Sequence, residues 1–71
     1  MKDLRSIIAK NIQTLRIENK LTQLELAGIL NYSDKAISKW ERAEAIPDVT
    51  VLKRIADYFG VSVDFLLDHG P

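Results

Sequence analysis

The chain of 71 residues is long enough for one domain and too short for two, and its 46% hydrophobic and 28% charged residues argue against disorder. It contains no cysteine, which excludes disulfides and thiolate metal sites. The net charge is zero, yet residues 1–42 carry eight basic and five acidic side chains, while residues 43–71 carry two and five. This asymmetry is weak support for a polyanionic partner, because a swing of this size is common in short chains.

The N-terminal stretch spaces its apolar residues among charges, so it is neither a signal peptide nor a membrane span. We therefore expect a soluble protein in a reducing, cytoplasmic setting.

Apolar residues recur at helical spacing along the chain, and no segment alternates with period two. The first predicted helix covers about residues 3–19 and carries an apolar stripe at spacings of three and four: Leu4, Ile8, Ile12 and Leu15. Thr22 and Glu25 have the spacing of a capping box, which predicts the start of a second helix. That helix is expected to end near Asn31, a residue type that tolerates a left-handed backbone.

Three more helices complete the predicted order. Ser33 caps a third helix that runs to about Ala43, with Asp34 in the first turn, where the helix dipole favours a negative charge. A connector over residues 45–48 leads to a fourth helix ending at Gly60, and a fifth starts at the Ser62 cap and ends near residues 70–71. The sequence predicts one compact all-α domain of five helices over residues 1–71.

Residues 23–42 hold the most informative pattern. Two helices separated by about three residues must cross steeply, and Ala27 is the small residue that a close crossing needs. Ile37 and Trp40 lie one turn apart and are expected to seal the third helix onto the second. On the opposite side, the polar residues fall within about 140° of arc; they are Asp34, Lys35, Ser38, Lys39 and Arg42. Such a face can reach phosphates and base edges when its helix lies in a major groove.

The chain resembles the Cro/repressor-type, or XRE-like, helix-turn-helix family over roughly residues 8–67. The matching stretches are Leu21-Thr22-Gln23, Leu26-Ala27, Ile37-Ser38-Lys39-Trp40-Glu41-Arg42, Pro47-Asp48, Gly60-Val61-Ser62-Val63-Asp64 and Leu66-Leu67. The resemblance implies a five-helix fold, sequence-specific operator binding, and base-reading positions 34, 35 and 39. It also assigns Gln23 to a phosphate or base contact, and it pairs Arg16 with Glu41 in a structural contact.

The family often has glycine where this chain has Lys20, Asn31 and Ala43. Asn31 is a mild substitute. A left-handed backbone at Lys20 or Ala43 would cost about 1 kcal/mol each.

The sequence thus predicts a transcriptional regulator, a repressor, that binds operator DNA with the third helix, about residues 33–43, in the major groove. The expected DNA-binding residues are Gln23, Ser33, Asp34, Lys35, Ser38, Lys39 and Arg42, of which Gln23 and Arg42 set the register on phosphates. Two alternatives remain. The lysines could be an ordinary solvated face, and Asp34 suits the first helical turn better than cytosine reading.

A rival function is an interaction module or an antitoxin built on the same fold. We also expect a homodimer through residues 43–71, weak in solution and tighter on an operator, because a small core cannot bury every apolar side chain near the fourth and fifth helices: Tyr58, Val61, Val63 and Phe65. The alternative is that these residues are simply core and that the chain binds DNA singly or dimerises through another segment. No cofactor, small-molecule site, metal cluster or nucleophile–base pair is predicted, so an enzyme has almost no support.

Overall fold

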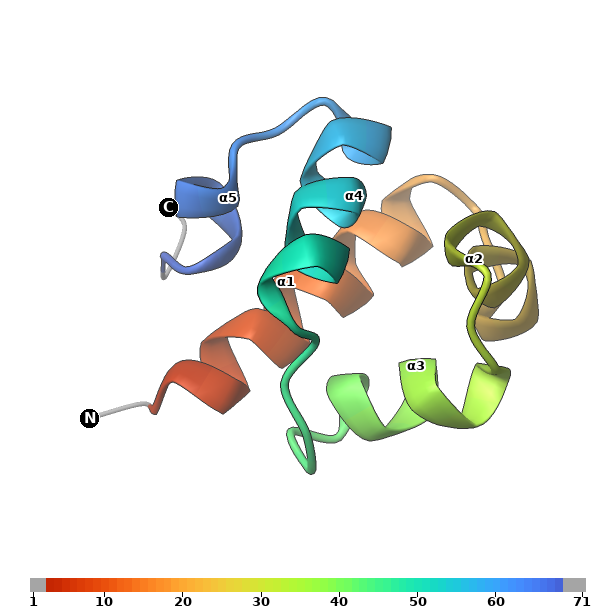
Figure 1. Ribbon diagram of the computed structural model, residues 1–71, viewed down its shortest axis with the longest axis horizontal. Coiled ribbons are helices and arrows are strands. Elements are labelled where there is room, and N and C mark those ends of the chain that lie inside the picture. Colours follow the sequence, from red (N-terminus) through yellow and green to blue (C-terminus); the bar gives the residue numbers. More distant parts are fainter. Residues whose placement is uncertain (1–2, 69–71) are drawn as a thin grey trace.

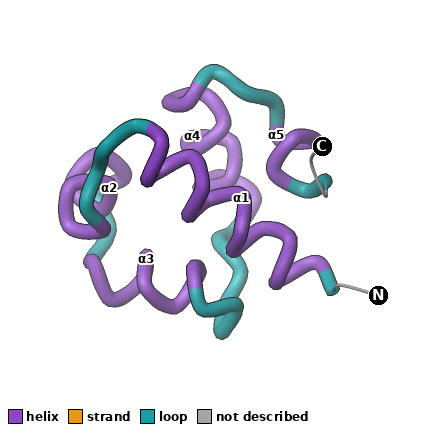
Figure 2. Tube along the Cα trace, turned by 180° about the vertical axis from the view of Figure 1, so that it is seen from behind, coloured by secondary structure: helices purple, strands orange, loops and turns teal. Residues whose placement is uncertain are grey.

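The computed structural model describes residues 3–68, which form five helices and no strand. The helices are α1 (Leu4–Glu18), α2 (Gln23–Leu30), α3 (Asp34–Glu41), α4 (Val49–Phe59) and α5 (Val63–Leu66). Figure 1 shows α1 crossing the middle of the molecule, α3 along the lower edge, and α2 and α5 on opposite sides. The view from behind has the same arrangement (Figure 2). The predicted all-α, five-helix architecture is confirmed.

Each helix starts at a residue whose side-chain oxygen accepts a hydrogen bond from the backbone amide three positions later. These N-cap residues are Asp3, Thr22, Ser33, Asp48 and Ser62. The first amides of a helix have no partner within the helix, so these contacts determine where each helix begins. At Thr22 the predicted capping box is complete: the Glu25 amide donates to Thr22 Oγ1 at 3.0 Å, and the Thr22 amide donates to Glu25 Oε1 at 2.8 Å.

One buried apolar cluster holds the five helices together. Its largest fully buried side chains are Ile8, Ile12, Leu26, Leu30, Ile37, Ile55 and Leu66. Burial of each side chain contributes about 1.5–3 kcal/mol to folding, which is large compared with the net stability of a domain of this size. Ala27 is also buried, and α2 packs against α3. None of the helices within residues 3–68 is long and apolar enough to cross a membrane.

Within residues 3–68, three residues with a Cβ adopt a left-handed backbone: Lys20 (φ 58°), Asn31 (φ 61°) and Ala43 (φ 61°). These are the three positions at which the family often has glycine. Asn31 ends α2, and the Tyr32 amide donates to the Ala27 carbonyl at 2.9 Å, which closes the turn toward α3. Lys20 and Ala43 carry a steric cost of about 1 kcal/mol each, because Cβ approaches the following carbonyl.

Two predicted helix ends are wrong. The third helix ends at Glu41 and not near Ala43, because the left-handed Ala43 turns the chain back. The Glu44 amide then donates to the Lys39 carbonyl at 2.9 Å. The fifth helix ends at Leu66, well before the predicted end near residues 70–71, which lie outside the described part of the chain.

The early end of α5 has a partner on α1. Asn11, a buried polar residue, donates through Nδ2 to the carbonyls of Phe65, Leu66 and Asp68 at 3.2, 2.9 and 2.7 Å. The last carbonyls of a helix have no partner within the helix. Asn11 supplies that partner and ties α5 to α1.

Candidate nucleic-acid interface

An ion pair fixes α3 to α1. Arg16 donates from Nε to Glu41 Oε2 at 2.6 Å and from Nη2 to Glu41 Oε1 at 3.0 Å. The Glu41 side chain is 2% exposed and that of Arg16 is 13% exposed. The two-point contact matches the planar guanidinium to the carboxylate, and it raises the pKa of Arg16 further above its ordinary value. The structure therefore brings together the pair that the resemblance suggested.

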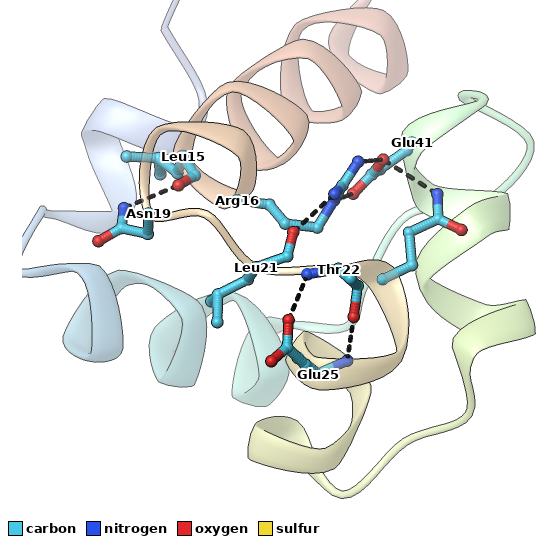
Figure 3. A network of polar contacts seen from close by, with 8 residues as sticks. Leu15, Arg16, Asn19, Leu21, Thr22, Glu25 and Glu41 are labelled. Carbon is cyan, nitrogen blue, oxygen red and sulfur yellow. Dashed lines mark hydrogen bonds and ion pairs between the residues drawn. The ribbon is translucent and has the colours of Figure 1, made fainter.

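Two further segments form hydrogen bonds with the same ion pair (Figure 3). Arg16 donates from Nη1 to the Leu21 carbonyl at 2.8 Å, which holds the turn between α1 and α2. Gln23, at the start of α2, donates from Nε2 to Glu41 Oε1 at 3.1 Å. Glu41 thus accepts three hydrogen bonds and links α1, α2 and α3. The sequence suggested a DNA contact for Gln23 but gave no sign of this contact with Glu41.

Apolar contacts complete the inner face of α3. Ile37 and Trp40 are buried in the core cluster, as expected from their spacing. The Tyr32 ring lies 5.4 Å from the Trp40 ring, centroid to centroid, and tilts by 58°. Tyr32 therefore covers Trp40 at the turn between α2 and α3.

The outer face of α3 is polar. Asp34, Lys35 and Lys39 are exposed, and Ser38 is half-buried. Ser33 is exposed too, but its Oγ accepts a hydrogen bond from the Ala36 amide at 3.2 Å, so its role as an N-cap is established. The inner face of α3 is anchored to α1 and α2, and the exposed outer face leaves two lysines available to a partner along one side of the molecule.

Arg42 follows α3 and has unforeseen neighbours. Its Nε and Nη2 donate to the two carboxylate oxygens of Glu44 at 2.8 and 3.3 Å, and its Nη1 donates to Ser38 Oγ. The hydrogen bonds between Arg42 and Glu44 raise the pKa of Arg42 and lower the pKa of Glu44. Both side chains are exposed. Sequence reasoning missed Glu44, because the contact depends on the left-handed backbone at Ala43.

Arg54 on α4 was missed as well. It donates from Nη1 to the Leu30 carbonyl at 2.7 Å and from Nη2 to the Ile29 carbonyl at 3.3 Å. A cation at the carboxyl end of α2 also interacts favourably with the helix dipole. The helix that leads into the turn before α3 is therefore held at both ends, by Gln23 and by Arg54.

A comparison with protein-family models identifies the family to which this arrangement of α2 and α3 belongs. A helix-turn-helix family model of the XRE type matches residues 12–66, which include both helices and most of the core. The chain belongs to this helix-turn-helix family. Within it, α2 and α3 are the two helices of the motif, and residues 31–33 form the turn.

Relatives of this helix-turn-helix chain are named as transcriptional regulators. It is 43% identical over 58 residues to the HTH-type transcriptional activator BcrR of Enterococcus faecalis, a match covering 82% of this chain and 28% of the relative. The chain thus spans little more than a quarter of that protein's length. It is 35% identical over 60 residues to the uncharacterized HTH-type transcriptional regulator y4dJ of Sinorhizobium fredii, covering 84% of this chain and 78% of the relative.

A solved structure of the same fold contains DNA. The P22 c2 repressor in complex with a synthetic operator superposes with a TM-score of 0.81 and 31% identity, covering 87% of this chain and 94% of the repressor chain. Within residues 3–68, the structure contains no group of three or more histidine, cysteine, aspartate or glutamate side chains placed to hold a metal ion.

Proposed function

We propose that this domain binds double-stranded DNA in a sequence-specific way and regulates transcription, with α3 in the major groove. One observation carries the proposal. The buried face of α3 is anchored to α1 and α2, while the opposite face presents Lys35 and Lys39 to solvent. A lysine on a rigid helix can donate to guanine O6 and N7, a contact that discriminates between bases by about 1–3 kcal/mol.

The roles of the individual residues follow from their positions. Lys35, Ser38 and Lys39 read base edges, and Asp34 is a candidate fourth reader. The first turn of α2 and the side chain of Arg42 contact phosphates, which set the register without carrying sequence information. Gln23 Nε2 already donates to Glu41 Oε1, so Gln23 contacts a phosphate either through its second N–H or after giving up that hydrogen bond.

Selection of bound sequences from a random DNA pool tests this proposal. We expect an enriched motif, and we expect Lys39→Ala to weaken binding to that motif more than binding to random DNA. Lys53→Ala is the matched control, because Lys53 is equally cationic but lies on α4 in an exposed pair with Asp57. Failure to enrich any sequence, with no shift of any duplex, would overturn the proposal and favour the interaction module.

We further propose that two copies bind an operator together through α4 and α5. One recognition helix reads only a few base pairs, and family members solve this with two half-sites about one helical turn apart. Tyr58 is 50% exposed and Phe65 is 39% exposed, whereas Val61 and Val63 pack partly against the core. Sedimentation with a selected duplex tests the dimer: two chains on an inverted repeat support it, and one chain per duplex at saturation refutes it.

Repression by occupation of the operator is the output that we propose, in the cytoplasm of a bacterium. The P22 protein is named a repressor and supports this output, whereas the E. faecalis relative is named an activator. A promoter–reporter assay with the selected site decides between loss and gain of transcription.

A further inference from the structure

An acidic side chain lies among the groups proposed to contact DNA. Glu44 accepts hydrogen bonds from Arg42 Nε at 2.8 Å and from Arg42 Nη2 at 3.3 Å. Arg42 Nη1 donates to Ser38 Oγ. All three guanidinium nitrogens of Arg42 therefore have an acceptor within the protein, and three of its five N–H groups are in use.

The backbone creates this pairing. Residues two apart in a continuing helix do not face each other. Ala43, with φ 61°, reverses the chain after α3, and the Glu44 amide returns to the Lys39 carbonyl at 2.9 Å. This turn brings the Glu44 carboxylate back beside the Arg42 guanidinium. A conformation that costs stability at Ala43 thus places a negative charge at the carboxyl end of the recognition helix.

We propose that Glu44 competes with DNA phosphate for the guanidinium of Arg42 and so sets the affinity of this end of α3 for DNA. The inference rests on the proposed DNA-binding function. A phosphate and a carboxylate both prefer the paired N–H edge of a guanidinium. To offer its Nε and Nη2 edge to a phosphate, Arg42 must leave Glu44.

The exposure of the pair determines the size of the effect. The side chains of Arg42 and Glu44 are 56% and 52% exposed. Exposed ion pairs are weak, so releasing Arg42 reduces the affinity for DNA by no more than about five-fold. Arg42 lowers the pKa of Glu44, and Lys39 adds a smaller effect in the same direction, so the carboxylate stays ionised at neutral pH. DNA can displace Glu44, but the affinity for DNA is lower than it would be if Arg42 had no carboxylate partner.

Binding of a random-sequence duplex by the full chain, followed by fluorescence anisotropy over a salt series, tests the inference. We expect Glu44→Gln to tighten binding about two- to five-fold near 0.1 M salt. The slope of log affinity against log salt should steepen by up to about 0.9, the value for one additional phosphate contact. In an Arg42→Ala background, Glu44→Gln should have no such effect.

Asp57→Asn is the matched control. It removes the same single negative charge and breaks an exposed pair, Lys53–Asp57, on α4. The inference is overturned if Asp57→Asn tightens binding as much as Glu44→Gln, since the effect is then one of net charge. It is also overturned if Glu44→Gln acts equally without Arg42. If the wild-type chain binds DNA and Arg42→Ala changes nothing, the inference alone fails; if the wild-type chain binds no duplex at all, the proposed function fails with it.

Discussion

Replacing Glu41 with alanine should lower the free energy of unfolding by about 3 kcal/mol. The carboxylate is 2% exposed and accepts hydrogen bonds from Arg16 and Gln23. Removing one member of a buried pair costs about 3–5 kcal/mol, because the other charge stays without its partner. Arg16 keeps its bond to the Leu21 carbonyl and some contact with water, which places the loss at the lower end.

This loss is large for a chain of 71 residues. Native domains have about 0.05–0.15 kcal/mol of stability per residue, so a domain of this length has roughly 4–11 kcal/mol in total. A loss of about 3 kcal/mol corresponds to a fall in Tm of roughly 12–24 °C. Urea and thermal denaturation followed by circular dichroism measure both quantities.

Asp57→Ala is the control for burial. The Lys53–Asp57 pair has the same shortest nitrogen–oxygen distance, 2.6 Å, as the Arg16–Glu41 pair, but its side chains are 65% and 62% exposed. An exposed pair of this kind contributes less than about 1 kcal/mol. If the two alanine variants lose equal stability, burial does not determine the effect and the reasoning is refuted.

Three other predictions concern the backbone, α5 and pH. Lys20→Gly and Ala43→Gly should each raise the free energy of unfolding by up to about 1 kcal/mol, because glycine removes the Cβ clash. Urea denaturation measures this, and an unchanged urea midpoint would contradict the assignment of strain. Asn11→Ala should cost about 1–3 kcal/mol and speed amide exchange in α5 more than in α1, and uniform exchange would argue against a local tie. The pKa of Glu44, measured by NMR titration, should lie below its ordinary value and rise in Arg42→Ala. Because the folded pKa is depressed, the contribution of Glu44 to stability is present above its unfolded pKa and is lost as pH falls through the folded pKa.

Local contacts made most of the fold predictable from sequence. A cap and the amide that it binds are three residues apart, so the starts of α2 to α5 can be found from neighbouring residues: Thr22, Ser33, Asp48 and Ser62. Helical periodicity likewise identified Ile37 and Trp40 as buried and the lysines as exposed.

Distant contacts were not predictable in the same way. Asn11 bonds to carbonyls 54 to 57 residues away, and Arg54 bonds to carbonyls 24 and 25 residues away. Neither has a local signal, and the end of α5 was misplaced for this reason. Glu44 is near Arg42 in sequence, but its contact requires knowing that Ala43 is left-handed. The DNA contacts proposed for the outer face of α3 remain predictions.

In α3, the residues that attach the helix to the domain differ from those that face solvent. Its attachment to the rest of the domain uses Ile37, Trp40 and Glu41, whereas its outward side chains are Asp34, Lys35 and Lys39. Exchanging the outward set alters the chemical groups offered to a partner while every buried contact stays in place. New binding preferences can therefore arise by few substitutions at a small cost in stability, chiefly the favourable interactions of Asp34 and Lys39 with the helix dipole, during evolution or in a designed library that varies only these three positions.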